Sequence, residues 1–366
     1  MAKTLDVKYE SKHCYNIEIR PDFNDLGTSI NDLGLDAKRV MIVTDDNVGK
    51  LYSEKVKTVI SDTASKPEVH VFTLKAGEES KTLANIQNIY EALVINHFDR
   101  KDILIALGGG VVGDMTGFAA ATYMRGIDFI QIPTSLLSQV DSSIGGKTGV
   151  DFLSYKNMVG AFHMPRLVYI NTNVLKTLPK EQFICGMGEI IKHGLIKNND
   201  YYNWLKDNSK AVMSLDDNAL EYMIYESCKI KRDVVERDPK EMGERALLNF
   251  GHTIGHSIEK NSNFNLYHGQ CVGIGAVAAA FISMKYGSLT EEEYKDIRET
   301  LELYEMPLYD TTKDTDANTI YDYTLSDKKR AGNSIKFILL HSIGDAYIEK
   351  GLSKENILAG IKEIIK

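Results

Sequence analysis

The sequence has little cysteine, and what it has is scattered. Only 4 cysteines occur among 366 residues, at positions 14, 185, 228 and 271, and no C-x-x-C pair is present. Such wide and irregular spacing fits neither a zinc knuckle nor a disulfide framework. Free thiols are typical of a reducing compartment, so we expect a cytoplasmic protein.

The chain also lacks an excess of basic residues and any long apolar run. Its formal net charge of -8 argues against nucleic acid or an anionic membrane surface as a partner. The N-terminus has no apolar core of signal-peptide length, and the most apolar run, residues 271–284, is too short to span a bilayer. We therefore expect a soluble protein in which residues 271–284 form a buried helix. Positive charge for an anionic substrate would have to be concentrated locally.

The length and the pattern of apolar residues predict two domains. A chain of 366 residues exceeds one ordinary core. In the first half, short apolar runs alternate with helical stretches, which predicts an α/β domain with a parallel sheet covered on both faces. From about Thr177 onward the pattern is mostly α-helical, with late extended segments only near residues 334–349. The predicted strands are residues 39–45, 69–74, 102–107, 126–133 and 166–170. The predicted helices of the second half include residues 181–196, 219–235, 246–256, 269–287, 290–303 and 354–366.

A glycine-rich loop indicates nucleotide or phosphate binding. Gly108, Gly110 and Gly113 are in G-x-G-x-x-G register after a predicted strand and before a predicted helix, where phosphates can approach the helix N-terminus. The alternative is that these glycines merely permit the turn. The loop follows a late strand, and Asp128, about twenty residues on, begins a strand instead of ending one. Asp45, at the end of a strand, is a better candidate for a ribose diol, so we expect a cofactor spread over several strand ends.

A second glycine turn carries Lys147. A P-loop would need glycine at position 141, where this chain has Asp141, which argues against a Walker-type kinase or ATPase. Lys147 can still hold a phosphate as a point charge, or it can be an ordinary loop lysine.

Two histidines four residues apart suggest a metal site. His252 and His256 share one face of a predicted helix, but Thr253 stands where a zincin would have glutamate. His268 and Glu189 are candidate partners for a catalytic site that keeps one position open. Spacing leaves open which three of these four residues are ligands. It also leaves open a structural alternative, in which the histidines pack in the core and Glu189 pairs with Lys192 or His193.

Taken together, these segments resemble the 3-dehydroquinate synthase family of sugar-phosphate cyclases. The similar blocks occur in the family's order and spacing and span most of the chain. They are residues 76–81, 107–126, 131–151, 156–165, 186–194, 247–259, 267–275 and 327–329. The resemblance implies a Rossmann-like NAD-binding domain over residues 1–177 and a helical metal- and substrate-binding domain over residues 178–366.

The resemblance also assigns site residues to this sequence. The implied ligands of one divalent metal, zinc or cobalt, are Glu189, His252 and His268. The implied NAD contacts are Asp45, Asn47, Glu78, Lys81, Gly110, Val111, Val112, Gly113, Asp114, Thr134, Ser135, Lys147 and Lys156. The implied substrate and catalytic residues are Arg125, Asp141, Lys147, Asn157, Lys192, Lys231, Arg245, Asn249 and His256, with Lys328 or Lys329.

The implied activity is the second step of the shikimate pathway, which leads to aromatic amino acids. The substrate would be 3-deoxy-D-arabino-heptulosonate 7-phosphate, converted to 3-dehydroquinate and phosphate by transient oxidation, phosphate elimination, re-reduction, ring opening and an intramolecular aldol closure. The Arg125 equivalent of the family can reach the neighbouring subunit, which implies a homodimer. Two small departures are Ser135, which keeps the hydroxyl of a common threonine, and Gly188, where alanine is common. The nearest different reaction would be that of a glycerol or iron-type alcohol dehydrogenase.

Overall fold

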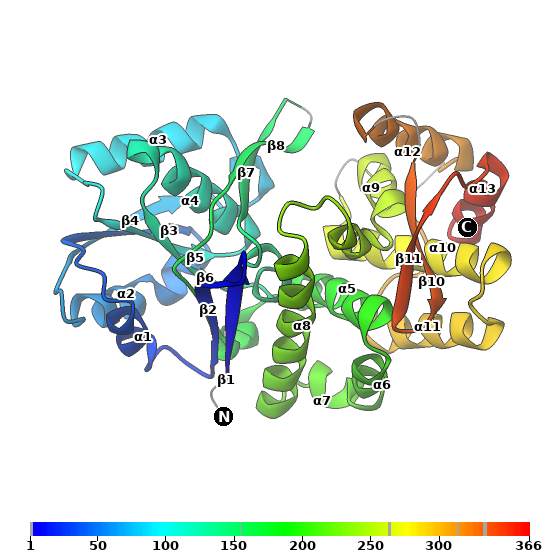
Figure 1. The fold of residues 1–366 in the computed structure, drawn as a ribbon, viewed down its shortest axis with the longest axis horizontal. Coiled ribbons are helices and arrows are strands. Elements are labelled where there is room, and N and C mark those ends of the chain that lie inside the picture. Colours follow the sequence, from blue (N-terminus) through cyan, green and yellow to red (C-terminus); the bar gives the residue numbers. More distant parts are fainter. Residues whose placement is uncertain (1–2, 154, 263–264, 313–314, 332–334) are drawn as a thin grey trace. The chain divides into compact units, whose positions relative to one another are not determined.

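The structure is a computed structural model that describes residues 3–153, 155–262, 265–312, 315–331 and 335–366. The chain divides into two compact units (Figure 1). The first comprises Met1–Leu178 with Leu220–Arg232, and the second comprises Pro179–Ala219 with Asp233–Lys366. Helix α8 (Asp217–Arg237) therefore contributes residues to both units.

The first unit is built on a seven-stranded sheet with the order β1-β2-β9-β6-β5-β3-β4. All pairs are parallel except the β1–β2 hairpin at one edge. The five strands predicted from the sequence are present. The sheet strands are β1 (Lys3–Tyr9), β2 (Lys12–Arg20), β3 (Arg39–Asp45), β4 (Glu68–Leu74), β5 (Ile103–Gly108), β6 (Asp128–Pro133) and β9 (Leu167–Asn171).

Helices cover both faces of this sheet, as the continuous apolar strands predict. Alternate residues of β3 and β5 point to opposite faces. Met41 and Leu104 pack against α3 (Leu83–Ile95) and α4 (Gly110–Thr122). Ile42 and Ile105 pack against α1 (Leu26–Asp32) and α2 (Val48–Ser61). A separate hairpin, β7 (Lys147–Phe152) and β8 (Tyr155–Phe162), was not predicted from the sequence.

The second unit is mostly helical, with one antiparallel pair of strands. Its helices, besides the ends of α8, are α5 (Lys180–Lys197), α6 (Asn199–Asp207), α7 (Ser209–Met213), α9 (His252–Asn261), α10 (His268–Tyr286), α11 (Glu291–Leu303), α12 (Ala317–Ala331) and α13 (Lys354–Glu363). Its strands are β10 (Lys336–Ser342) and β11 (Asp345–Lys350). The apolar run at residues 271–284 lies in α10 and is almost wholly buried, as predicted. No helix within the described ranges combines the length and the apolar character needed to cross a membrane.

The prediction of one helix over residues 246–256 was wrong. Residues Glu244–Asn249 form a 3-10 helix, and α9 begins only at His252. Gly251 separates the two with a left-handed backbone, φ 78°, which glycine adopts without steric cost. A side chain at Gly251 would also collide with the backbone of α10, because its Cβ would lie 2.7 Å from the carbonyl oxygen of Val272. The break therefore places His252 in the first turn of α9, beside α10.

Candidate metal and cofactor sites

The candidate metal ligands of the second unit meet because two helices approach each other closely. Gly188 of α5 faces Gly269 of α10, and a Cβ at Gly188 would lie only 2.5 Å from the carbonyl oxygen of Gly269. A Cβ at Gly269 would in turn overlap the backbone of Cys185. The missing side chains let the helices approach backbone to backbone. This approach brings Glu189, next to Gly188, beside His268, the first residue of α10.

Glu189 presents a carboxylate oxygen to two histidines. Its Oε1 lies 3.5 Å from Nε2 of His252 and 3.8 Å from Nε2 of His268. The residue is 1% exposed, and Oε1 is a buried atom without a hydrogen-bond partner. The other oxygen, Oε2, accepts a hydrogen bond from the Lys192 ammonium. A buried oxygen normally has a partner, and a cation shared with the two imidazoles would satisfy this one.

His252 is held in the form that a metal ligand requires. Its Nδ1 lies 3.2 Å from the carbonyl oxygen of Phe250, an acceptor, so Nδ1 carries the proton and Nε2 keeps its lone pair. Burial lowers the pKa of His252 well below its ordinary value, and the Lys192 ammonium and the two neighbouring histidines lower it further. The imidazole is therefore neutral, with Nε2 directed toward Glu189.

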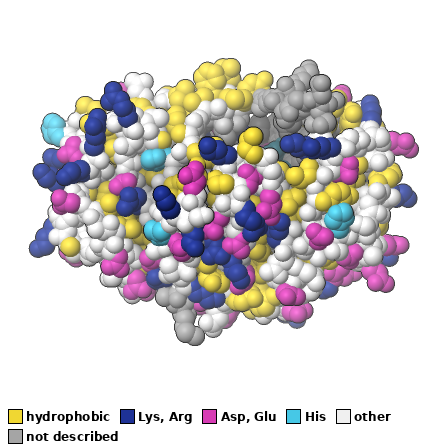
Figure 2. Space-filling model, viewed as in Figure 1, with side chains coloured by type: hydrophobic (Ala, Val, Ile, Leu, Met, Phe, Trp, Pro, Cys, Tyr) yellow, Lys and Arg dark blue, Asp and Glu magenta, His cyan; other side chains and the backbone are white. Residues whose placement is uncertain are grey.

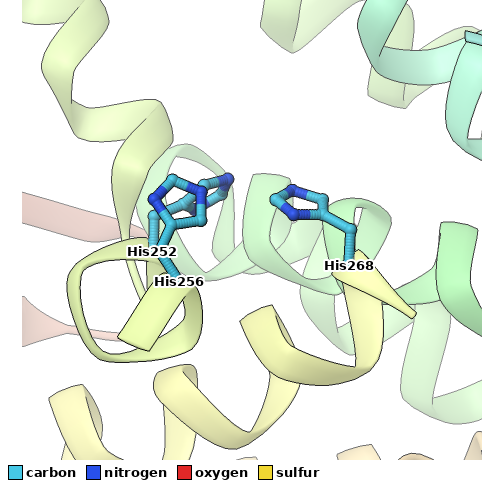
Figure 3. A group of neighbouring side chains, drawn as sticks. All are labelled: His252, His256 and His268. Atoms are coloured by element: carbon cyan, nitrogen blue, oxygen red, sulfur yellow. The ribbon is translucent and has the colours of Figure 1, made fainter. Parts of the chain in front are cut away.

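The three histidines form one cluster (Figure 3). His252 and His256 project from α9, and His268 projects toward them from the start of α10. The ring centroid of His256 lies 5.2 Å from that of His252 and 5.6 Å from that of His268. His252, His256 and His268 each offer a nitrogen within 4.8 Å of the others, so a second possible donor set is three histidines without Glu189. His256 is exposed, whereas Glu189 is buried.

The remaining assigned residues of the second unit lie on α5, on the 3-10 helix before α9 and on α12. Lys192 is 2% exposed and pairs with Glu189. Arg245 is buried and donates to the carbonyl oxygen of Pro239 at 2.7 Å, and Asn249 donates to Glu241 at 3.0 Å. Lys328 and Lys329 belong to α12, but their side chains lie outside the described residues.

The candidate cofactor residues of the first unit follow the carboxyl ends of neighbouring parallel strands. Asp45 ends β3, Glu78 and Lys81 follow β4, the glycine loop follows β5, and Thr134 and Ser135 follow β6. The chain runs from β3 to β4 on one side and then to β5 on the other. A crevice at such a reversal of strand order is where ligands of open α/β sheets bind. The candidate residues thus lie at several strand ends.

The glycine loop places the N-terminus of α4 at this edge. Gly109 caps α4, which begins at Gly110 and continues through Val111, Val112 and Gly113 to Asp114. A Cβ at Gly113 would lie 2.8 Å from the Gln131 side chain, so the third glycine permits close packing of helix on sheet. The free N–H groups of the first turn suit a phosphate. Asp45 uses Oδ1 to accept from the backbone N–H groups of Asn47 and Val48, both at 2.9 Å.

Lys81 connects several of the assigned residues. Its ammonium donates to Asp114 at 2.7 Å and to Asn157 at 2.5 Å, and it lies 3.8 Å from Glu78. Burial opposes the charge of Lys81, but Asp114 and Glu78 outweigh burial and raise its pKa. For Asp114, burial raises the pKa, although the Lys81 ammonium acts in the opposite direction. Asn157, assigned to the substrate by resemblance, thus contacts the cofactor set.

The other assigned cations of the first unit differ in exposure. Lys231 of α8 is buried and pairs with the carboxylate of Asp141. Lys147 and Lys156 are exposed on the β7–β8 hairpin. Arg125 is exposed in a left-handed backbone conformation, φ 71°.

The chain is similar to known proteins over most of its length. The sequence model described as 3-dehydroquinate synthase N-terminal matches residues 71–185, and the one described as 3-dehydroquinate synthase C-terminal matches residues 186–330. The chain is 44% identical to the 3-dehydroquinate synthase of Ruminiclostridium cellulolyticum, over 94% of each chain. It is also 44% identical to that of Shewanella pealeana, over 97% of this chain and 98% of the relative. A solved structure of 2-deoxy-scyllo-inosose synthase complexed with carbaglucose-6-phosphate, NAD+ and Co2+ is 25% identical, with a TM-score of 0.88 over 99% of this chain and 100% of that one.

Proposed function

The chain belongs to the 3-dehydroquinate synthase family and is a phosphate-eliminating cyclase, and we propose that its divalent metal is held by Glu189, His252 and His268. The observation that carries this proposal is the convergence of one buried, unsatisfied carboxylate oxygen with two Nε2 atoms, at 3.5 and 3.8 Å. Two histidines and one carboxylate are a catalytic zinc set that leaves a position open for substrate. The relative complexed with Co2+ supports a divalent ion here.

We favour this donor set over the three-histidine set because of burial. If His256 were the third ligand, Oε1 of Glu189 would remain buried beside the ion without being used, at the cost of an unsatisfied polar atom. His256 is exposed and stands one helical turn from His252. In this scheme His256 shuttles a proton or holds the phosphate of the substrate.

The cofactor in this proposal is NAD, bound at the carboxyl ends of β3, β4, β5 and β6. The first turn of α4 would hold its phosphates, and Asp45 a ribose diol through its Oδ2. Lys81 and Asp114 would orient the groups around them. The relative complexed with NAD+ supports the choice of cofactor.

The residues of the chain then account for the substrate's two anionic groups. When bound, the metal would supply a Lewis acid that lowers the pKa of a substrate hydroxyl, and NAD+ would supply a hydride acceptor. Lys192, already beside Glu189, would hold the substrate carboxylate. Lys147, Arg245 and the Lys231–Asp141 pair supply further polar contacts, with Asn249 and Asn157 completing the set. Local cations thus bind an anion although the whole chain is acidic.

We further propose a homodimer that uses the β7–β8 hairpin. The tip and outer strand of the hairpin expose large apolar side chains: Phe152, Leu153 (83% exposed), Tyr155, Met158 and Phe162. Figure 2 shows apolar side chains gathered along the edge where this hairpin lies in Figure 1. Arg125, in its left-handed turn next to the exposed Met124, would then reach the neighbouring subunit. A sedimentation experiment in which Phe162→Asp leaves the dimer intact would contradict this interface.

The proposed function is tested by following phosphate and NADH together. The substrate 3-deoxy-D-arabino-heptulosonate 7-phosphate is added to the enzyme with NAD+, before and after removal of metal by a chelator. We expect phosphate release without net NADH, loss of release on metal removal, and recovery with Zn2+ or Co2+. Stoichiometric NADH without phosphate would instead indicate an alcohol dehydrogenase, and phosphate release from fully metal-free enzyme would contradict the metal's role.

A further inference from the structure

His268 is flanked by carboxylates on both of its ring nitrogens. Nε2 lies 3.8 Å from Oε1 of Glu189, and Nδ1 lies 3.5 Å from Oε2 of Glu259. Glu259 is 4% exposed. Sequence reasoning assigned no role to Glu259, yet a signal was present. His252, His256 and Glu259 follow one another at i, i+4 and i+7, so they share one face of α9.

A buried carboxylate is costly unless a charge or a donor compensates it. The His268 ring provides such a donor when its proton is on Nδ1. In that tautomer Nε2 has a lone pair and points toward Glu189, as a metal ligand requires. A carboxylate behind a ligating imidazole fixes the ring orientation and raises the basicity of the ligating nitrogen.

His252 and His268 differ in the group that faces Nδ1. The Nδ1 of His252 is held by a neutral backbone carbonyl, that of Phe250, at 3.2 Å. The Nδ1 of His268 faces an anionic side chain. The donor strength of His268 therefore depends on a residue that a substitution can alter, while that of His252 does not.

We propose that Glu259 is a positioning residue that holds the Nδ1 proton of His268 and directs Nε2 to the metal, an inference that rests on the metal site proposed above. Glu259 acts through His268 and does not itself touch metal or substrate. Its carboxylate also adds a negative charge close to the cation, which strengthens binding of the ion.

The test compares Glu259→Gln with the unaltered enzyme after both are stripped of metal. Co2+ affinity is measured by competition with a chromophoric chelator, and the visible absorption spectrum of the cobalt-loaded protein is recorded. We expect the affinity for Co2+ to fall about 10–100-fold and the absorption bands to shift, because the ligand field of His268 changes. Affinity within twofold of the unaltered enzyme, with an unchanged spectrum, would overturn the proposal.

A matched control is Glu363→Gln, the same change at a carboxylate of α13 that accepts hydrogen bonds from Tyr294 and Arg298, each at 2.8 Å. This control should alter thermal stability without altering the cobalt spectrum. If Glu259→Gln does not fold, Glu259→Asp is used instead, because its shorter side chain keeps the carboxylate but moves it away from His268. An unchanged affinity of Glu259→Asp for Co2+ would count equally against the proposal.

A His268→Ala background separates failure of this inference from failure of the metal site. If Glu259 acts through His268, Glu259→Gln should weaken Co2+ binding no further once His268 is absent. An equal loss in both backgrounds would overturn the proposal for Glu259. If His268→Ala itself leaves Co2+ affinity unchanged, the proposed metal site fails as well.

Discussion

Oε1 of Glu189 lies 3.5 Å from Nε2 of His252, in the interior of the second unit, and no hydrogen bond satisfies it. Two acceptor atoms facing each other repel unless a cation lies between them. Burial, the Lys192 ammonium and the neighbouring histidines lower the pKa of His252 well below its ordinary value, so a proton on Nε2 is not the ordinary bridge. The metal-free site is therefore unsatisfied in a way that a divalent ion corrects.

Lys192 is the group that compensates Glu189 when no metal is bound. Lys192→Met should destabilise the metal-free enzyme by about 3 kcal/mol, because removing one partner leaves an uncompensated buried charge. Saturating Zn2+ should recover most of this loss, since the ion replaces the ammonium as the counter-charge. Denaturant unfolding with and without Zn2+ measures both values. An equal cost in the two states would show that Lys192 does not compensate Glu189.

In this structure a side chain at Gly188 should be disfavoured, although alanine is common at this position in the family, because the backbone of Gly269 fills the space. Gly188→Ala should cost about 1–3 kcal/mol and weaken metal binding, because its Cβ, 2.5 Å from the carbonyl oxygen of Gly269, would push α5 away from α10. Gly27→Ala is the control, since its Cβ would meet the nearest atom at 3.4 Å. Differential scanning calorimetry should show Gly27→Ala unfolding at or above the temperature of the unaltered enzyme. A Gly188→Ala variant equally stable and equally able to bind metal would contradict the close approach.

Glu244 should make the stability of the second unit sensitive to acid. Hydrogen bonds from Arg237, at 2.7 and 3.0 Å, and from Lys197, at 2.5 Å, lower the pKa of Glu244 from 4.5 to about 2. Because the pKa of Glu244 is lower in the folded than in the unfolded chain, its ionised carboxylate stabilises the fold at pH values above the unfolded pKa. This stabilisation is lost as the pH falls from 4.5 toward 2. Because the ion pairs are partly exposed, the effect is a few degrees in Tm.

The measurement is thermal unfolding of the unaltered enzyme and Glu244→Gln from pH 7 to pH 3. The difference in Tm should be constant down to about pH 5, where the free carboxyl begins to titrate, and should shrink below it. A difference that grew on acidification would mean that Glu244 stabilises the fold in its protonated form.

Lys81 is predicted to be needed for cofactor binding. Lys81→Met removes the ammonium that holds Asp114 and Asn157, at 2.7 and 2.5 Å, and should weaken NAD+ binding about tenfold or more. Calorimetric titration with NAD+ gives the affinity. Lys101→Met, at an exposed lysine of the same unit, should leave it unchanged. Equal affinity in the two variants would remove Lys81 from the cofactor site.

Most of the fold could be predicted from the sequence, and the exceptions have physical causes. Strands β3, β5, β6 and β9 are almost wholly buried because both faces of the sheet are covered, whereas the edge strand β4 is mostly half-buried or exposed. The first half of strand β8 is exposed on both faces, and only Val159 and Ala161 of its second half pack against the core, which is too short an alternation to detect in the sequence. The β1–β2 hairpin does alternate buried and exposed residues, so a usable signal was present there.

The proposed metal site could be predicted only in part. Helical spacing predicts that His252 lies beside His256. In the structure, the buried carboxylate of Glu189 lies close to His252 and to His268. Which residues meet depends on the contact of α5 with α10 at Gly188 and Gly269, and such contacts between distant segments leave no periodic pattern. The break at Gly251 has the same origin, because the close backbone of α10 leaves no room for a side chain there.

The central claim is that Glu189, His252 and His268, and not His256, hold the metal. The most direct test is the Zn2+ content of His252→Ala and His256→Ala after dialysis against the same metal buffer. We predict that His256→Ala keeps one Zn2+ per chain and loses turnover, while His252→Ala loses the metal. Equal loss of Zn2+ from both variants would contradict this donor set and favour the cluster of three histidines.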